Sequence, residues 1–321
     1  GLSLAGLQLW NSIRALDFLE ALPYVKRDAI GITGESGGGT QTFMLAAVDP
    51  RVAAAVPVNM VSLHMQGGCL CENPPGLRLE TTNAEIAATI APRPLLLVSA
   101  TGDWTAETLE VEYPAVRALY VLVGAEDRVS AVRFTAEHNY NKDSREAMYG
   151  WMARWLKGAP SAGPVAERAF SPDALPDLLV FHARPLPDGA VTAAALTAGW
   201  IESAKRQAAA TPLAERAAAL RHALGFGGEA TRGQAPTPAR SKSAATRRPT
   251  VLVAGDQPDV VAALRKAGLP VRPITFTPFD QAAAGKVRHF ETYNRTRAGQ
   301  RVADIVSALR AAPGAVLVAS G

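Results

Sequence analysis

The sequence has 321 residues, of which 48% are hydrophobic and 19% are charged, a composition typical of a globular protein that buries a substantial core. It contains no run of 18 apolar residues, so the sequence predicts no membrane-spanning helix. The net charge of +4 does not indicate a nucleic-acid partner, because residues 230–250 carry five basic side chains and no acidic one, which leaves the remainder near neutral.

The first half of the chain alternates predicted helices and strands. Apolar residues three to four positions apart indicate helices, and short continuous apolar runs indicate buried strands. We expect helices at residues 7–20, 37–48, 111–124 and 142–157, and strands at 29–33, 51–58, 95–99 and 129–135. A long excursion without a predicted element covers residues 59–91. This alternation predicts an α/β fold with a mostly parallel sheet flanked by helices.

The second half is less regular and ends in a second, partial α/β unit. Its predicted strands lie at residues 250–254, 271–276 and 315–319, with helices ending near 267 and covering 296–311. The predicted organisation is a catalytic domain portion at 1–160, a Pro- and Ala-rich connection with short helices at 161–229, a basic flexible linker at 230–249, and the second unit at 250–321. A polyanion-binding role for the basic segment is the alternative to a linker.

Residues 34–38 (Gly-Glu-Ser-Gly-Gly) lie between the predicted strand 29–33 and the predicted helix 37–48. This is the context in which a G-x-S-x-G sequence forms a nucleophile elbow. The sharp turn strains the serine, and glycines two positions to either side relieve the crowding. We predict Ser36 as a nucleophile and the N–H of Gly37 as a donor to the oxyanion. A glycine-rich turn without chemistry is the alternative.

A nucleophilic serine needs a base, and the base needs an acid that orients it. In hydrolases with this elbow the chain order is serine, acid, histidine. Asp103 directly follows strand 95–99 and His138 directly follows strand 129–135. Both are therefore expected at the same sheet edge as Ser36, because the carboxyl ends of parallel strands meet there. We predict Asp103 as the acid and His138 as the base.

Other acidic residues fit the role less well. Glu126 and Asp127 precede the last strand of the first half, so they are expected at its far end, about 20 Å from His138. Asp143 is expected to cap the helix that follows. Glu137 is adjacent to the base in sequence and is expected to point away from it.

The two cysteines, Cys69 and Cys71, lie one residue apart, a spacing that seldom meets the geometry of a disulfide. Together with His64 they form three potential ligands in one loop, without the second ligand pair of a structural zinc site. We expect free thiols, no metal and no cofactor.

Further short motifs accompany the elbow. In chain order they are GESGGGTQT at 34–42, PVNM at 57–60, QGGC at 66–69, CEN at 71–73, PRP at 92–94, GDWT at 102–105 and HNYN at 138–141. As a set, between about residues 6 and 156, these motifs resemble acetyl xylan esterase-like α/β-hydrolases. That family is related to the dienelactone hydrolase and prolyl oligopeptidase branches.

The resemblance implies an α/β-hydrolase fold and cleavage of an ester, such as an acetyl group on a plant polysaccharide. The partner would be a small-molecule or polysaccharide ester. Family members are often exported by bacteria, although no signal peptide pattern follows Gly1. Residues at the substrate pocket would include Glu35, Asn59, His64, Trp104 and Asn141, and core packing or loop hydrogen bonding is the alternative.

The sequence also departs from the family. Members have several strands before the elbow, whereas one helix and one strand precede Ser36 here, and the missing part includes the loop that gives the second oxyanion donor. Residues 250–321 resemble the front half of a second hydrolase unit. We therefore expect a fragment of a longer tandem protein. Alternatively, the second series completes the first sheet in a permuted order.

The resulting prediction is a serine hydrolase that forms an acyl-enzyme on carboxylic esters. Two alternatives stay open: a prolyl oligopeptidase-like serine peptidase, and a truncated hydrolase without activity of its own. The sequence makes no prediction of the acyl group, the alcohol or the oligomeric state.

Overall fold

The computed structural model describes residues 3–63, 68–212, 215–216, 219–220 and 248–319. The chain divides into two compact units, the first comprising Gly1–Pro74 and Glu80–Ala210, and the second Pro75–Leu79 and Thr211–Gly321. Most of the predicted linker at 230–249 lies outside the described residues.

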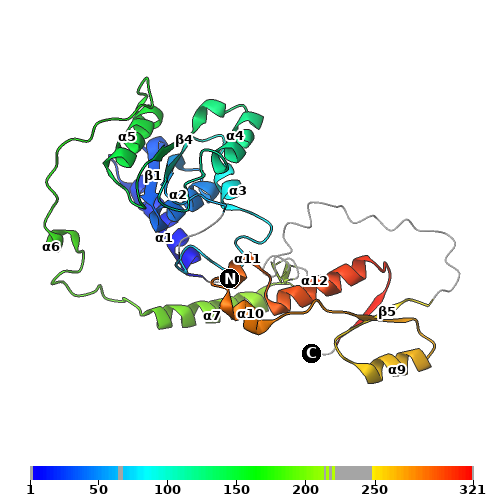
Figure 1. Cartoon of the computed structure of the whole chain (residues 1–321). Coiled ribbons are helices and arrows are strands. Elements are labelled where there is room, and N and C mark those ends of the chain that lie inside the picture. The colour runs from blue at the N-terminus through cyan, green and yellow to red at the C-terminus, as the bar shows by residue number, and fades with distance from the viewer. Residues whose placement is uncertain (1–2, 64–67, 213–214, 217–218, 221–247, 320–321) are drawn as a thin grey trace. The chain divides into compact units, whose positions relative to one another are not determined.

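The first unit contains a four-stranded parallel sheet with helices packed on it (Figure 1). Its strands, in spatial order, are β1 (Ile30–Glu35), β2 (Val52–Val58), β3 (Leu95–Ala100) and β4 (Val129–Phe134). Its helices are α1 (Leu4–Ala21), α2 (Gly37–Val48), α3 (Asn83–Ala88), α4 (Glu112–Leu122), α5 (Lys142–Lys157), α6 (Leu175–Leu178) and α7 (Ala193–Ala210), with 3₁₀ turns η1 (Arg27–Ala29) and η2 (Glu126–Arg128). This architecture confirms the predicted α/β fold class.

The core of this unit is divided by the sheet, because successive side chains of a strand point to opposite faces. On one face, Ala55 and Leu97 belong to a cluster that includes residues of α2, α3 and α4. On the other face, Val56 and Leu96 pack with Trp151 of α5. Since β2 and β3 are covered on both sides, their sequences are continuously apolar, as is typical of central parallel strands.

The parallel strands bring several loops to one edge of the sheet. β1 ends at Glu35, β3 at Ala100 and β4 at Phe134. The loops that leave these ends carry the three residues predicted as nucleophile, acid and base.

Helix α3 lies within the excursion at 59–91, where the sequence predicts no element. Its start is a capping box: the Thr82 hydroxyl accepts from the N–H of Glu85 at 3.2 Å, and the Glu85 carboxylate accepts from the N–H of Thr82 at 2.7 Å. The helix is only six residues long. It therefore shows too little apolar periodicity to be predicted from its pattern alone.

The start of α5 also differs from the expectation. The side chain of Asn141 accepts from the N–H of Ser144 at 3.0 Å and caps the helix. The prediction that Asp143 is the cap is wrong, because Asp143 already lies inside the first turn. There its charge favours the helix N-terminus without capping it.

Packing against α5 continues past residue 160. Arg145 donates to both carboxylate oxygens of Glu167, at 2.6 and 2.8 Å, and the N–H of Val165 donates to the carbonyl of Glu146 at 3.0 Å. The guanidinium of Arg145 lowers the pKa of Glu167 to about 2. The segment around Glu167 is therefore held on the first unit.

The second unit contains a separate three-stranded parallel sheet in the order β6-β5-β7. Its elements are β5 (Val251–Ala254), α9 (Pro258–Lys266), β6 (Val271–Ile274), α10 (Gln281–Lys286), α11 (Phe290–Tyr293), α12 (Arg297–Arg310) and β7 (Val316–Ala319). Among the described residues these strands pair with one another, so the alternative that they complete the first sheet is wrong.

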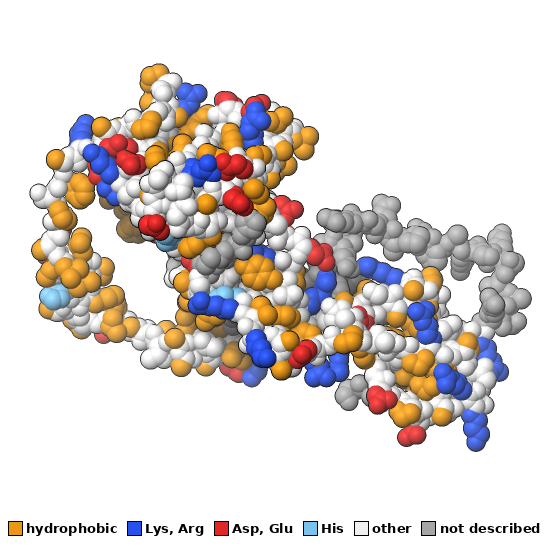
Figure 2. All heavy atoms as spheres, viewed as in Figure 1, with side chains coloured by type: hydrophobic (Ala, Val, Ile, Leu, Met, Phe, Trp, Pro, Cys, Tyr) orange, Lys and Arg blue, Asp and Glu red, His pale blue; other side chains and the backbone are white. Residues whose placement is uncertain are grey.

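On the face drawn in Figure 2, acidic and basic side chains are interspersed over the first unit, with no large area of one sign. In the described part of the chain, no helix is both long and apolar enough to cross a membrane.

Candidate active site

The turn after β1 holds Ser36 in a left-handed conformation, with φ 56° and ψ −120°. Non-glycine residues adopt such angles rarely and only where the surroundings enforce them. Here the N–H of Ser36 donates to the carbonyl of Val58 on the neighbouring strand at 3.1 Å, and its carbonyl accepts from Thr40 at 2.9 Å. The turn is therefore fixed on both sides, and Ser36 sits at the N-cap of α2.

Two glycines allow this turn, and one of them differs from the expectation. A Cβ on Gly34 would lie 2.5 Å from the carbonyl group of Gly38, and a Cβ on Gly39 would lie 2.8 Å from Met60 and from the carbonyl of Val58. A Cβ on Gly38 would meet nothing within 4 Å. The expectation that the second glycine of the motif relieves crowding is wrong for Gly38, because Gly39 is the residue that faces β2.

Gly37 is the first residue of α2, so its N–H has no intrahelical acceptor. It lies at the helix N-terminus, where the helix dipole favours negative charge. The role of the Gly37 N–H as an oxyanion donor stays a prediction.

His138 and Asp103 lie next to each other at the carboxyl edge of the sheet. Nδ1 of His138 is 2.8 Å from Oδ2 of Asp103, whose side chain is only 2% exposed. The Trp104 ring packs on the imidazole, with 4.4 Å between the ring centroids. A buried carboxylate at this nitrogen favours the tautomer with the proton on Nδ1, which leaves Nε2 to act as a base.

Thr105 fixes the second oxygen of Asp103, a role that the sequence reasoning missed. The Thr105 hydroxyl and N–H donate to Oδ1 of Asp103 at 2.5 and 2.7 Å. The same hydroxyl accepts from the N–H of Ala100, the last residue of β3, at 3.2 Å. An Asp followed two residues later by Thr is a typical local turn pattern, and this spacing is the signal that could have identified Thr105.

Replacing Thr105 by valine is expected to lower kcat about 10- to 100-fold with little change in KM. The reason is that a hydroxyl donating to a charged group contributes about 1.5–3 kcal/mol, and here it orients Asp103, the predicted acid, rather than the substrate. Steady-state kinetics on an ester substrate give the measurement, and Thr105→Ser is the control, since it keeps the donor. Equal losses in both variants would contradict this role.

The second ring nitrogen of His138 lies next to Glu35. Nε2 of His138 lies 2.8 Å from Oε1 of Glu35. Among the described residues no hydrogen bond joins His138 to the Ser36 hydroxyl. Burial raises the pKa of Glu35 most strongly, the nearby His138 lowers it, and the carboxylates of Asp103 and Glu72 raise it further. Glu35, predicted at the substrate pocket, thus lies beside the candidate base.

Two other predicted pocket residues are engaged in loop structure. Asn59 has φ 49° and is buried, and its side-chain amide donates to the carbonyl of Asn139 at 2.9 Å. It thereby ties the end of β2 to the loop that carries His138. Asn141 caps α5, as described above. His64 lies outside the described residues.

One group of described residues offers three potential metal ligands: Cys69, Cys71 and Glu72, with ligand atoms within 4.8 Å of one another. Both cysteines are free thiols. A hydrogen bond with Cys71 and the neighbouring Glu72 carboxylate raise the pKa of Cys69 to about 11. Zinc binds thiolates, so binding at this group would require the thiols to lose their protons.

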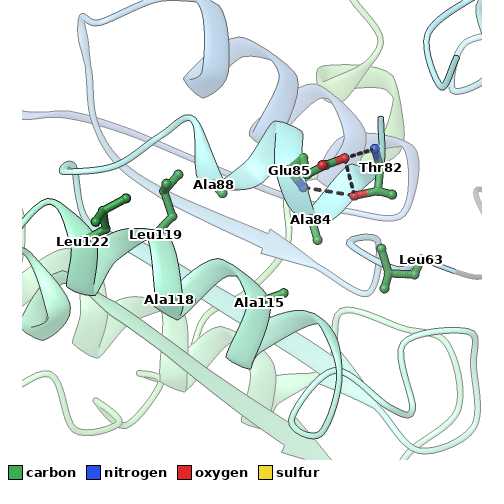
Figure 3. Close-up of a pocket in the computed structure, with 9 residues that line it drawn as sticks. All are labelled: Leu63, Thr82, Ala84, Glu85, Ala88, Ala115, Ala118, Leu119 and Leu122. Atoms are coloured by element: carbon green, nitrogen blue, oxygen red, sulfur yellow. Dashed lines mark hydrogen bonds between the residues drawn. The ribbon is translucent and has the colours of Figure 1, made fainter. Parts of the chain in front are cut away.

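An apolar groove of about 590 Å³ lies between α3 and α4 (Figure 3). Leu119 and Leu122 of α4 line one side, and Ala84 and Ala88 of α3 line the other. Its polar side chains are already engaged in the capping box at the start of α3. The groove contains none of the residues predicted for catalysis.

Residues 13–139 match the model of a family described as "BAAT / Acyl-CoA thioester hydrolase C terminal". This range includes Ser36, Asp103 and His138. The chain is also 27% identical over 161 residues to "Putative hydrolase YtaP" of Bacillus subtilis (strain 168), which covers 47% of this chain and 54% of that protein. The chain thus spans about half the length of this curated relative.

Solved structures similar to this chain include several esterases. The methylesterase BT1017 is 38% identical with a TM-score of 0.46, and the match covers 48% of this chain and 36% of that one. A carbohydrate esterase family 15 glucuronoyl esterase from Caldicellulosiruptor kristjansonii is 20% identical with a TM-score of 0.40, covering 51% and 53%. The predicted resemblance to the α/β-hydrolases is confirmed by the matched family.

Proposed function

We propose that the first unit of this chain is part of the catalytic domain of a serine hydrolase that cleaves carboxylic esters through an acyl-enzyme. Ser36 is the nucleophile, His138 the base and Asp103 the acid. The observation that carries the proposal is the 2.8 Å contact between Nδ1 of His138 and the buried carboxylate of Asp103. This pair lies at the sheet edge where Ser36 occupies a strained turn at a helix N-terminus.

In the first half of the reaction, Nε2 of His138 takes the proton of the Ser36 hydroxyl while Oγ bonds to the ester carbonyl carbon. The carbonyl electron pair moves to the oxygen, which accepts a hydrogen bond from the N–H of Gly37. The proton on Nε2 then passes to the alcohol oxygen as the carbon–oxygen bond breaks. The acid part of the ester remains on Ser36.

In the second half, His138 takes a proton from water, and the resulting hydroxide attacks the acyl-enzyme. Collapse of the second tetrahedral intermediate returns the proton to Oγ of Ser36 and releases the acid. Asp103 keeps the imidazole in one tautomer throughout and stabilises its charged form without itself taking the proton.

The substrate class we propose is a carbohydrate ester of the acetyl xylan type, on the basis of the motif set between residues 34 and 141. The matched family model favours a second candidate, an acyl thioester. The two candidates share the nucleophile and differ in the leaving group, because a thiolate leaves without needing a proton from His138.

Labelling of the full chain with a fluorophosphonate probe tests the proposal, with Ser36→Ala as the control. We expect labelling of the native chain and complete loss in the variant, because the probe bonds only to an activated serine oxygen. Absence of labelling in a chain that unfolds cooperatively would contradict the proposal. If the chain is labelled, hydrolysis of acetylated xylo-oligosaccharides, acyl-CoA thioesters and short peptides then separates the substrate classes.

A further inference from the structure

The imidazole of His138 lies between two carboxylates. Nδ1 is 2.8 Å from Oδ2 of Asp103, and Nε2 is 2.8 Å from Oε1 of Glu35. Glu35 is the last residue of β1 and directly precedes Ser36, so its side chain reaches the base from the nucleophile's own turn. Oε1 of Glu35 is buried without a hydrogen-bond partner among the described residues, and the side chain as a whole is 22% exposed.

The contact between Nε2 and Glu35 requires a proton. With one proton on Nδ1 facing Asp103, a neutral imidazole presents a lone pair at Nε2. An ionised carboxylate presents only lone pairs as well, so two acceptors would repel at 2.8 Å. The short contact is therefore favourable only when His138 or Glu35 carries a further proton, and because Oε1 makes no hydrogen bond among the described residues, its attraction to an imidazolium is one of charge.

Three charged or titratable groups surround Glu35, each carried by a different loop. His138 comes from the loop after β4, Asp103 from the loop after β3, and Glu72 from the excursion after β2. Burial and the two carboxylates raise the pKa of Glu35, and His138 alone lowers it. The surroundings therefore favour keeping a proton in this cluster of three carboxylates and one imidazole.

We propose that Glu35 is a second carboxylate partner of the base and stabilises the protonated form of His138. This inference rests on the proposed function. When Nε2 receives the proton of Ser36, the resulting imidazolium is flanked by Asp103 and Glu35, which lowers the cost of that step. In the free protein the same pair holds one proton at low pH, so Nε2 is open to Ser36 only after that proton is lost to solvent. Glu35 acts through His138 and is a positioning residue.

Replacing Glu35 by glutamine is expected to have two effects on fluorophosphonate labelling of Ser36. The acidic limb of the pH–rate profile should move to lower pH by about one unit, which corresponds to a tenfold lower affinity of the site for the proton. The plateau rate should fall several-fold, because the transition state loses one of its two flanking charges. Glu35→Asp keeps the charge, so its acidic limb and its plateau rate should both lie closer to those of the native chain.

The matched control is Glu137→Gln, which removes one carboxylate from the loop beside His138. Glu137 is exposed and makes no charged contact with the imidazole among the described residues. We expect its profile to overlay that of the native chain. Equal shifts for Glu35→Gln and Glu137→Gln would overturn the inference, because a general change in net charge would then explain both.

A measurement that needs no activity separates this inference from the proposed function. The titration midpoint of the Glu35 carboxyl carbon, read by NMR in the full chain, should rise when His138 is replaced by glutamine, because His138 lowers the pKa of Glu35 and the coupling between two charged groups is reciprocal. A higher midpoint supports the inference even if Ser36 is never labelled. An unchanged midpoint overturns it, even if labelling shows that the chain is a serine hydrolase.

The stability of the variant serves as the folding control. Because the folded-state pKa of Glu35 is raised from its ordinary value of 4.5, ionising this group destabilises the native chain as pH rises through and above that value. Glutamine removes this cost. Thermal unfolding should therefore show Glu35→Gln to be at least as stable as the native chain at neutral pH, with the difference disappearing at low pH.

Discussion

Replacing Asp103 by asparagine is expected to lower the labelling rate of Ser36 and kcat/KM by about 10⁴-fold, the order of magnitude that this change has in a Ser-His-Asp protease. The reason lies in the two donors of Thr105, which point at Oδ1. They hold the amide oxygen of the new asparagine in that place, so its NH₂ group faces Nδ1 of His138. The imidazole must then carry its proton on Nε2, where it is unable to accept the proton of Ser36.

The matched control for this prediction is Asp127→Asn. Asp127 lies in η2, directly before β4, and is therefore at the far end of the strand whose carboxyl end leads to His138. We expect labelling and ester hydrolysis within about twofold of the native chain. A large loss in Asp127→Asn with a small one in Asp103→Asn would show that a different acid orients the base.

Replacing Gly34 by alanine is expected to destabilise the chain by about 3 kcal/mol or more and to abolish labelling of Ser36. The added Cβ would lie 2.5 Å from the backbone of Gly38, and neither atom belongs to a flexible side chain that could turn away. Relief requires the start of α2 to move away from β1, which displaces both Ser36 and the N–H of Gly37. Chemical denaturation and fluorophosphonate labelling give the two readouts.

Gly38→Ala is the control for this substitution, since a Cβ there meets nothing within 4 Å and alanine favours a helix over glycine. It should be as stable as the native chain or slightly more stable, with labelling retained. Gly39→Ala should resemble Gly34→Ala, because its Cβ would press on Met60 and on the backbone of β2. If Gly38→Ala proved to be the damaging change, the steric account of the elbow would be wrong.

The sequence was sufficient for those features that depend on local pattern. Continuous apolar runs marked β2 and β3 because both strands are covered on two faces, and an amphipathic pattern marked α1 and α5. The G-x-S-x-G motif marked the turn because few backbone conformations join a strand to a helix so abruptly. The capping box of α3 and the Asn141 cap of α5 were missed, since several polar residues near a helix start satisfy the same local pattern.

The sequence by itself determined the order of the four strands and of the longer helices in the first unit, the elbow at Ser36 and the positions of Asp103 and His138 at strand ends, because these follow from local periodicity and from the parallel pairing it implies. Only the tertiary structure decided that Glu35 faces Nε2, that Thr105 fixes Oδ1 of Asp103, and that Asn59 holds the loop of His138. Most of these contacts join residues that are far apart in the chain. Such pairs depend on strand register and side-chain direction to within about an ångström, and no pattern along the sequence contains that information.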